Sequence, residues 1–373
     1  MKILQVSCEG LGNGGVQAVI MNICRNIPDA HFDILLFTSE RRYYDNEFEM
    51  LGGKIYRISN YEGLSKFRKK LDYYIRFFRI FFGTYKILKK SSSYDVIHCH
   101  NDLESGICNF AAYFVGIKVR ISHSHTANNK FSKNNIIGNV YKKFLQILMN
   151  YSSNVKISCT RKALISIFGK KYLTNSNSLI IPNAIEISRF QKTRSCIKLL
   201  NRINIVHVGR YCENKNQMLL IEILPYILNE YPDAILQLIG FDEEYKKKLQ
   251  NKAISLCVDS KVEFLPSNSD IKEILEKASL FIFPSVTEGF GIALLEAQAM
   301  EVPCLVSDSV PQEVDCGLCK FLSLSEKRDV WAAEAVKIIR DNYSMKLDQD
   351  KLNSLDIKYY VPKIKSIYEG EMV

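Results

Sequence analysis

The sequence lacks a long apolar run. No stretch of its 373 residues approaches the roughly 20 uncharged apolar residues that a membrane-spanning helix needs. The first residues, Met1–Glu9, lack the apolar core of a signal peptide and are typical of a β-strand. With 47% apolar and 24% charged residues, the composition excludes a disordered or fibrous protein. We therefore expect a folded, cytoplasmic protein.

Paired cysteine motifs are scarce as well, although the chain holds 11 cysteines. Cys316-x-x-Cys319 is the only CxxC, and no second pair follows at the spacing of a zinc site. Several others lie in or beside apolar runs, which favours small buried apolar residues over disulfide partners: Cys8, Cys99, Cys159, Cys257 and Cys304. We expect neither a metal nor another cofactor.

Acidic residues are few in the first half of the chain. The formal charge is +10, but residues 1–190 hold 27 Lys and Arg against 13 Asp and Glu, whereas the rest holds 23 against 27. A basic half joined to a mildly acidic half predicts two domains with different partners. The length of 373 residues is also large for one hydrophobic core.

Each half alternates short β-like apolar runs with helical patterns. This alternation predicts an α/β protein with two doubly wound, Rossmann-like domains that face one another across a cleft. The boundary is expected near residue 190, after Pro182-Asn183, and the segment 359–368 is typical of a helix. The expected strands are 2–7, 32–37, 95–100, 119–123, 203–208, 235–239, 262–265, 280–283 and 304–306, with a helix at 16–25.

The strongest motif is the segment 283–297. A strand leads into a loop with two glycines, and a helix then starts near Gly291. The N–H groups at such a helix end suit a phosphate, and glycines let the backbone approach it closely. Glu288 and Glu296 lie on either side of this point, so one carboxylate can reach a sugar hydroxyl and the other a ribose hydroxyl. Glu296 lies among apolar residues, where a carboxylate usually needs a partner.

Two further groups of polar residues follow expected strands. Arg210 and Lys215 come after the strand 203–208, where a diphosphate would need cations and no metal motif has to supply them. The alternative is a pair of solvated loop charges. His123 and His125 come at the end of the strand 119–123, so both could point into the cleft. The alternative is a histidine that binds a backbone carbonyl in a packed loop.

The segment 283–297 resembles the Glu-x7-Glu motif of the retaining glycosyltransferases of family 4, also called group 1, which have the GT-B fold. The resemblance extends over nearly the whole chain. Gly14-Gly15-Val16 resembles the glycine loop of that family, Pro182-Asn183-Ala184-Ile185 its Pro-Asn-Gly segment with Ala184 in place of glycine, and Gly209-Arg210 with Lys215-Asn216 its basic pair. His98-Cys99-His100-Asn101 and Ser122-His123-Ser124-His125-Thr126 are most similar to enzymes of capsular or exopolysaccharide synthesis.

The resemblance implies a retaining, metal-independent hexosyltransferase. It would move a hexose from a nucleotide-diphosphate sugar, most simply a UDP-sugar, to a lipid-linked or saccharide acceptor in surface polysaccharide synthesis. Residues 1–190 would bind the acceptor, with the helix 357–373 packed back onto them, and residues 191–356 would bind the donor. The implied catalytic residues are Glu288, His125, Arg210 and Lys215. Donor contacts also fall to Gly15, Phe290, Gly291, Ile292 and Glu296, and acceptor or secondary roles to Gly14, His123 and Asn183.

Two other functions remain open from the sequence. Gly10–Gly15 is a literal GxGxxG after a strand, and Glu40 follows near the end of the next one, which is the outline of an NAD(P)-dependent oxidoreductase. A non-catalytic nucleotide-sugar binding module is the other alternative. Asp348-Gln349-Asp350 is a literal Asp-x-Asp, but it follows no strand and is typical of a solvated helix face.

Residues 66–90 hold nine basic residues interleaved with aromatics at helical spacing, and Asp72 is the only acidic one. This is the composition of helices that lie on anionic membranes. The alternative is a helix packed on the core with a solvated basic face. We expect peripheral binding to the inner face of the cell membrane that weakens with salt. No nucleic-acid motif is present, so we expect no nucleic-acid partner.

Overall fold

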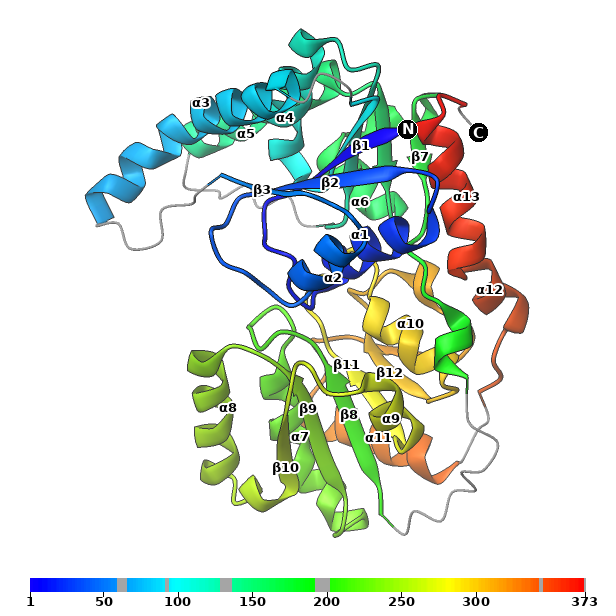
Figure 1. Cartoon of the computed structure of the whole chain (residues 1–373). Helices are drawn as coiled ribbons and strands as arrows, with labels where there is room; N and C mark the ends of the chain where they lie inside the picture. Colours follow the sequence, from blue (N-terminus) through cyan, green and yellow to red (C-terminus); the bar gives the residue numbers. More distant parts are fainter. Residues whose placement is uncertain (59–65, 91–93, 128–135, 192–201, 342–344, 372–373) are drawn as a thin grey trace. The chain divides into compact units, whose positions relative to one another are not determined.

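The computed structural model describes residues 1–58, 66–90, 94–127, 136–191, 202–341 and 345–371, with the backbone alone for 66–74. The chain forms two compact units: residues 1–183 with 359–373, and residues 184–358 (Figure 1). This division differs from the predicted boundary near residue 190. The reason is that Ile185 forms a β-bridge with Asp356, and the short helix η3 (Ile187–Phe190) packs on a helix of the second unit.

Unit 1 is built on seven parallel strands in the order β3-β2-β1-β4-β5-β6-β7. Their interior residues are nearly all buried, because helices cover both faces of such a sheet. The strands are β1 (Lys2–Ser7), β2 (His31–Leu36), β3 (Ile55–Arg57), β4 (Val96–Cys99), β5 (Val119–Ser124), β6 (Val155–Ser158) and β7 (Ser178–Ile180).

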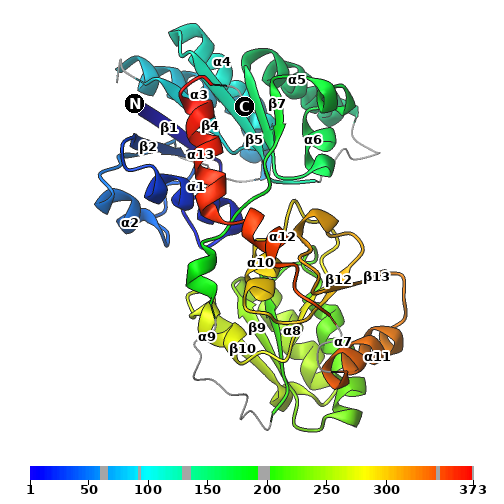
Figure 2. The ribbon, with the colours of Figure 1, turned by 90° about the vertical axis from the view of Figure 1, so that its right-hand side faces the viewer.

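The helices of unit 1 divide between the two faces of its sheet. α3, α4 and α5 pack on the face that presents Leu4, Val6, Ile97 and Cys99. The opposite face presents Gln5 and His98, and α13 contacts it (Figure 2). The helices are α1 (Gly15–Asn26), α2 (Asp45–Met50), α3 (Lys66–Lys90), η1 (Asp102–Glu104), α4 (Ser105–Val115), α5 (Ile136–Ser152), α6 (Arg161–Ile167), η2 (Lys170–Thr174) and α13 (Ile357–Tyr368).

Unit 2 has a six-stranded parallel sheet in the order β10-β9-β8-β11-β12-β13. A core cluster joins α7, α8 and α11 to one face of the sheet and includes the buried Trp331. The strands are β8 (Asn204–Val208), β9 (Ile235–Gly240), β10 (Val262–Pro266), β11 (Leu280–Phe283), β12 (Cys304–Ser307) and β13 (Cys319–Leu322). The helices are α7 (Gln217–Glu230), α8 (Glu243–Ser255), η4 (Asp259–Lys261), α9 (Ile271–Glu276), α10 (Ile292–Ala299), η5 (Gln312–Val314), α11 (Arg328–Arg340) and α12 (Gln349–Ser354).

The predicted α/β class is confirmed, since both sheets are parallel and flanked by helices. One cysteine prediction is wrong: Cys257 is exposed, because it leaves α8 with a positive φ of 54° in the turn before η4. Asp348 does belong to a helix, but as its N-cap, where its carboxylate accepts from the Lys351 N–H at 2.9 Å. Within the described residues, no helix combines the length and apolar character that crossing a bilayer requires.

Candidate active site

The predicted site residues lie beyond the carboxyl ends of the central strands of each sheet. In unit 1 the strand order reverses between β1 and β4, and in unit 2 it reverses between β8 and β11. At such a point the loops diverge from the carboxyl ends of the strands and leave room for a ligand. Gly14 and Gly15 follow β1, Arg210 and Lys215 follow β8, and Glu288 follows β11.

In unit 2 the loop after β8 is bonded to the loop after β11. The Asn214 carbonyl accepts from the Val286 N–H at 2.8 Å, and the Asn214 side chain donates to the Thr287 carbonyl at 2.8 Å. These bonds bring Lys215 to Glu288, with which its ammonium forms a partly buried ion pair. The structure thus joins two residues that the sequence identified separately.

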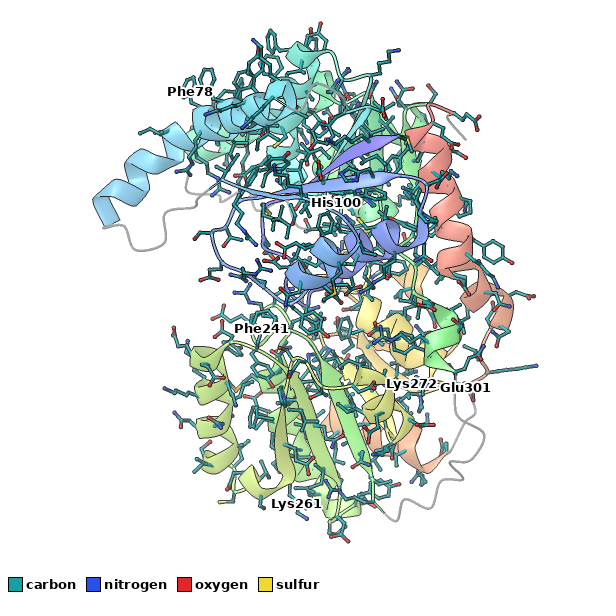
Figure 3. All side chains as sticks on the ribbon, viewed as in Figure 1. Phe78, His100, Phe241, Lys261, Lys272 and Glu301 are labelled. Atoms are coloured by element: carbon teal, nitrogen blue, oxygen red, sulfur yellow. The ribbon has the colours of Figure 1, made fainter. Side chains whose placement is uncertain are left out.

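The Lys215 ammonium also lies 4.8 Å from the centre of the Phe283 ring, so an aromatic face stabilises its charge. Arg210 is exposed, and its guanidinium lies 5.5 Å from the centre of the Phe241 ring, which is labelled in Figure 3. Each cation therefore has an aromatic neighbour that supports its charge while leaving donors available for an anion. The two cations belong to one loop, as a diphosphate site requires.

A buried polar residue that the sequence prediction missed holds this loop. Gln217, the first residue of α7, donates to the Arg210 carbonyl at 2.9 Å and accepts from the Cys212 N–H at 3.3 Å. It also donates to Nε2 of His207 at 3.3 Å, while Nδ1 of His207 donates to the Ile282 carbonyl at 2.8 Å. Burial lowers the pKa of His207 to about 4, so the ring is neutral. In the sequence, the position of His207 within an apolar strand and of Gln217 at the start of an apolar helix would have been the available indication.

The N-terminus of α10 lies beside the ion pair. Gly291 is its N-cap with a φ of 101°, a conformation that favours glycine. The predicted helix start is therefore the cap, and the helix begins at Ile292, with the Phe290 side chain buried before it. The first backbone N–H groups of a helix have no partner within it, so this turn can bind an anion.

Glu296 lies about one turn into α10, apart from the Lys215–Glu288 pair. Burial raises its pKa to about 7, and Arg189 of η3 opposes the rise. The short helix η3 packs against α10, which brings the positive charge of Arg189 near this carboxyl group. At neutral pH this carboxyl group is divided between its charged and neutral forms.

In unit 1 four histidines lie on one face of two adjacent strands. His98 and His100 are two residues apart at the end of β4, and His123 and His125 are two residues apart at the end of β5. Alternate residues of a strand share a face, and the register between β4 and β5 brings the two pairs together. All four rings are buried, and burial lowers the pKa of each, to about 3 for His125. The rings are therefore neutral at pH 7.

A first hydrogen-bond chain runs from Gln5 of β1 to His123. The Gln5 amide donates to the Tyr368 hydroxyl at 3.1 Å, and that hydroxyl lies 2.7 Å from Nδ1 of His98. We assign the hydroxyl as the donor to His98, which gives the hydroxyl one accepted and one donated hydrogen bond. His98 Nε2 then donates to His123 Nδ1 at 3.2 Å. His123 is left with an N–H at Nε2 that has no partner among the described residues.

A second chain runs from the same glutamine to His125. The Gln5 carbonyl oxygen accepts from Nε2 of His100 at 2.9 Å, and Nδ1 of His100 accepts from Nε2 of His125 at 2.8 Å. His125 therefore has a bare Nδ1, which also has no partner in the described part of the chain. The centres of the His123 and His125 rings are 4.0 Å apart, so the two chains end side by side in one donor and one acceptor. A ligand hydroxyl group could accept from His123 and donate to His125, because a hydroxyl both accepts and donates.

Other polar groups at the same edge of the sheet also lack partners within the described residues. Asn101 follows β4, and both polar atoms of its buried amide are unpaired, as is the side-chain oxygen of Asn183 after β7. A buried polar group without a partner costs about 1–3 kcal/mol, so these amides suit hydrogen bonds to a bound polar ligand or to water. Asp102 adjoins them and accepts from the Thr126 hydroxyl at 3.2 Å, and burial raises its pKa to about 6. The sequence prediction named neither Asn101 nor Asp102 as a site residue.

The cluster of His98, His100 and His123 could in principle hold a metal, because one nitrogen of each lies within 4.8 Å of the others. His98 and His123 bond directly to one another, and His100 bonds to Gln5 and His125. A metal would have to break these bonds. A neutral hydrogen-bond network accounts for the contacts of these rings without a metal.

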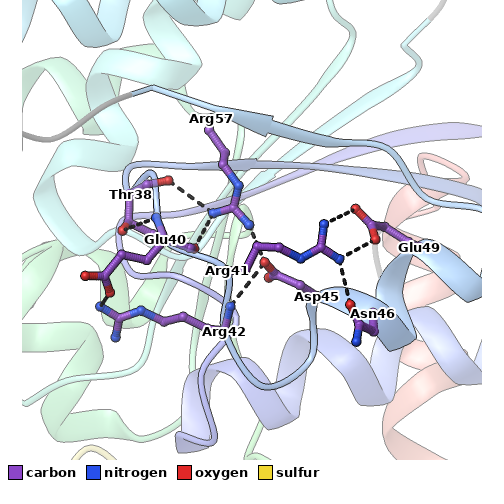
Figure 4. A network of polar contacts seen from close by, with 8 residues as sticks. All are labelled: Thr38, Glu40, Arg41, Arg42, Asp45, Asn46, Glu49 and Arg57. Atoms are coloured by element: carbon purple, nitrogen blue, oxygen red, sulfur yellow. Dashed lines mark hydrogen bonds and ion pairs between the residues drawn. The ribbon is translucent and has the colours of Figure 1, made fainter.

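The glycine loop of unit 1 leads into α1, with Gly14 as the N-cap and Gly15 as the first residue of the helix. Glu40, the acid of the dinucleotide pattern, is bound within its own loop (Figure 4). Its carboxylate accepts from Arg42 at 2.7 Å, and its backbone carbonyl accepts from Arg57 at 2.7 Å. The side chain of Arg42 fills the space beside Gly10. The carboxylate of Glu40, which would bind the ribose in a dinucleotide site, is therefore already paired with Arg42.

Comparison with known proteins bears on function directly. Residues 191–341 match the family described as glycosyl transferases group 1. EpsF of Bacillus subtilis (strain 168), named as a glycosyltransferase, is 27% identical over 87% of this chain and 84% of its own. The UDP-Gal:alpha-D-GlcNAc-diphosphoundecaprenol alpha-1,3-galactosyltransferase of Escherichia coli is 26% identical over 95% and 93%. CapH of Staphylococcus aureus, a capsular polysaccharide biosynthesis glycosyltransferase, is 24% identical over 96% of each chain.

Solved structures show the fold. HepE of Anabaena, crystallised with UDP and glucose, matches with a TM-score of 0.79 at 17% identity over 99% of this chain and 100% of its own. WaaG, a glycosyltransferase of lipopolysaccharide biosynthesis, matches with a TM-score of 0.68 at 17% identity over 99% and 98%. The fold is GT-B, and the relatives align along nearly the whole chain, so neither the oxidoreductase nor the non-catalytic alternative is retained. Residues 191–341 match the group 1 glycosyltransferases, and relatives named as glycosyltransferases align along nearly the whole chain, so the protein is a glycosyltransferase.

Proposed function

We propose that the protein moves a hexose, with retention of configuration, from a UDP-sugar to a lipid-linked or saccharide acceptor in surface polysaccharide synthesis. The observation that carries this proposal is in unit 2. Arg210, the Lys215–Glu288 pair and the start of α10 lie on loops that leave β8 and β11 at the reversal of strand order. A nucleotide diphosphate needs this combination of cations and free N–H groups.

Each of these residues has a proposed task. Arg210 and Lys215 neutralise the charge that grows on the leaving diphosphate, a contribution that is usually the largest in such a reaction. The backbone N–H groups around Phe290, Gly291 and Ile292 assist them. Glu288 holds the donor sugar through its hydroxyls.

Glu296 binds the ribose of the donor, from its place on α10. In unit 1, the bare Nδ1 of His125 accepts from a hydroxyl of the donor sugar, and Gly15 lets that sugar approach the loop closely. His123 donates to the same hydroxyl or a neighbouring one. Gly14 and Asn183 adjoin the acceptor. Support for unit 1 comes from the open ends of the two histidine chains and from the unpaired amides.

The reaction needs no metal or other cofactor under this proposal. Cationic side chains and helix N–H groups supply the positive charge that a divalent ion gives in other transferases. A relative that acts on a diphosphoundecaprenol-linked sugar suggests a lipid-linked acceptor for this chain too. The enzyme would then work as a peripheral protein at an anionic membrane surface, to which the basic first half of the chain would be attracted.

A panel of nucleotide sugars tests the donor. A ligand that binds only the folded protein raises its melting temperature, by an amount that grows with the ratio of concentration to Kd. We expect UDP-hexoses to raise it more than GDP- or ADP-sugars, and NMR of the transferred sugar to show the anomeric configuration of the donor. If no nucleotide sugar stabilises the protein or an inverted product forms, the proposal is wrong.

A further inference from the structure

The outer side of α3 is apolar and exposed. Ile75, Phe78 and Phe82 follow one another at helical spacing, and Phe78 and Phe82 are 58% and 60% exposed. Figure 3 shows Phe78 pointing outward from the helix. The residues that bind α3 to the core are different ones, Ile80 and Leu88, both almost fully buried. Phe78 and Phe82 therefore lie away from the surface of α3 that packs against the core.

The outer side of α5 repeats this pattern. Val140, Phe144, Ile147 and Tyr151 recur every three or four residues, and Ile147 and Tyr151 are 59% and 66% exposed. The opposite side of the helix supplies the residues buried in unit 1: Leu145, Leu148 and Met149. A helix with one apolar side in the core and a second one on the surface is unusual for a free surface, because exposed apolar stripes usually mark an interaction site.

α4 connects these two helices, and ring contacts make the surface continuous. Between ring centres, Phe114 of α4 lies 6.0 Å from Phe81 of α3, and Tyr113 of α4 lies 5.9 Å from Tyr151 of α5. The ring centres of Phe77 of α3 and Phe144 of α5 are also 5.9 Å apart. We call this surface the aromatic face; its exposed members are Ile75, Phe78, Phe82, Tyr113, Phe114, Val140, Phe144, Ile147 and Tyr151.

The charge of the three helices that carry the aromatic face is mostly positive, although Arg76 of α3 is paired with Glu104 of η1. The sequences of α3, α4 and α5 hold nine, no and two basic residues, against Asp72 as the single acidic one. Lys86, Lys89, Lys90 and Lys143 are exposed, so cations flank the apolar side chains. Apolar side chains with exposed lysines beside them match the boundary between acyl chains and anionic headgroups.

We propose that the aromatic face inserts into an anionic lipid bilayer, with the flanking lysines on the headgroups. This rests on the proposed function, in which the acceptor is lipid-linked, and it changes the expected mode of binding. Charge alone predicts attachment that disappears with salt, whereas buried apolar side chains add attachment that salt does not screen. The lysines bring the protein to the surface, and the aromatic face holds it there.

Co-sedimentation of the full chain with phosphatidylcholine vesicles, with and without phosphatidylglycerol, tests the two contributions. We expect tighter binding to the anionic vesicles at about 0.1 M salt, and a measurable remainder at about 1 M salt, where screening is nearly complete. Phe82→Ser with Ile147→Ser should lower binding at least tenfold and abolish the remainder. The matched control changes two exposed apolar residues of unit 2, Tyr226→Ser with Ile254→Ser, which are 48% and 60% exposed, and should bind like the wild type.

A tryptophan placed on the face reports insertion even where a serine variant fails to fold. Phe82→Trp should shift its emission to the blue with anionic vesicles and be quenched by brominated acyl chains, while Tyr226→Trp is not. Equal quenching of both, or unchanged binding of the serine pair, overturns the proposal. So does a stable dimer that the serine pair dissociates, because the face would then cover a second copy. Transfer to a short-chain acceptor without vesicles reports the proposed function separately and should be unaffected by the serine pair.

Discussion

The hydroxyl of Tyr368, three residues from the end of the described chain, lies 2.7 Å from Nδ1 of His98, although 270 residues separate the two. Tyr368 is the last residue of α13, and its ring is buried. The bond fixes which nitrogen of His98 carries the proton, and through His98 it fixes His123. The final helix thus determines the hydrogen-bonding state of a candidate site residue on β5.

Tyr368→Phe should therefore destabilise unit 1 by about 1–3 kcal/mol, because it leaves a buried His98 nitrogen and the Gln5 amide without their partner. Urea denaturation monitored by circular dichroism measures the change. Tyr43→Phe is the control, since it removes a hydroxyl from an exposed tyrosine of the same unit and should change stability by less than about 0.5 kcal/mol. Equal effects of the two variants would show that the bond to His98 contributes nothing.

Much of the fold can be predicted from the sequence, because buried parallel strands are continuous apolar runs. β1 was predicted to the residue, and β11 likewise. β3, β7 and β13 were missed, since each has three or four residues at a sheet edge and none is fully buried. β6 was also missed, because its four buried residues alternate with the polar Lys156 and Ser158 and form no continuous apolar run. Such short segments become strands because they pair with a neighbouring strand, and their local sequence does not indicate this pairing.

The candidate site could be predicted only in part, for a related reason. Glu288 and Lys215 were each identified from their own loops, but their ion pair depends on bonds between Asn214 and the loop after β11. Tyr368 was unpredictable as a partner of His98, since only the folded chain brings them together. The paired His-x-His segments were a usable signal, because two such segments on neighbouring parallel strands share one face.

Arg210→Ala and Lys215→Ala should each lower turnover about tenfold or more, which is the scale of losing one charge-stabilising contact. The protein should stay folded, although Lys215→Ala also leaves Glu288 without its partner. Initial rates with a UDP-sugar measure the effect. Lys248→Ala is the control, since its exposed lysine contacts Glu244 and the ring of Tyr245 within its own helix, α8. Wild-type rates in both site variants would contradict the role of this loop.

Activity should survive prolonged treatment with EDTA, because side chains and N–H groups meet the diphosphate. The His98–His100–His123 cluster makes this a sharp test, since it is the group of described residues that could ligate an ion. We expect the melting temperature and the rate to be unchanged after metal removal. Loss of either property, with recovery on adding Zn²⁺, Mg²⁺ or Mn²⁺, would assign a metal to the protein.

A binding experiment should distinguish the roles of the two candidate carboxylates of unit 2, Glu288 and Glu296. Glu296→Gln should weaken binding of free UDP, because its proposed contact is to the ribose. Glu288→Gln should leave UDP binding nearly intact and reduce transfer, because its proposed contact is to the sugar that UDP lacks. Isothermal calorimetry and initial rates give the two quantities. The opposite pattern would exchange the roles, and no change in either variant would remove both from the site.

Binding of the donor should depend on pH through Glu296. Burial raises the pKa of its carboxyl from 4.5 to about 7. The folded protein therefore holds an extra proton between these values, and the stability from that proton, present below about pH 4.5, is lost as the pH rises to about 7. A carboxylate accepts stronger hydrogen bonds from ribose hydroxyls than a carboxylic acid does, so the ionised form should bind the donor better.

If only the ionised form binds, the apparent affinity rises about tenfold between about pH 6 and pH 8, as the ionised fraction rises from about a tenth to about nine tenths. Calorimetry should use an intact UDP-hexose, because its diphosphate has no terminal phosphate to titrate in this range. Glu296→Gln should remove the dependence, since an amide does not titrate, whereas Glu288→Gln should keep it. A wild-type affinity that is flat from pH 6 to 8, or that falls, would place Glu296 away from the ribose.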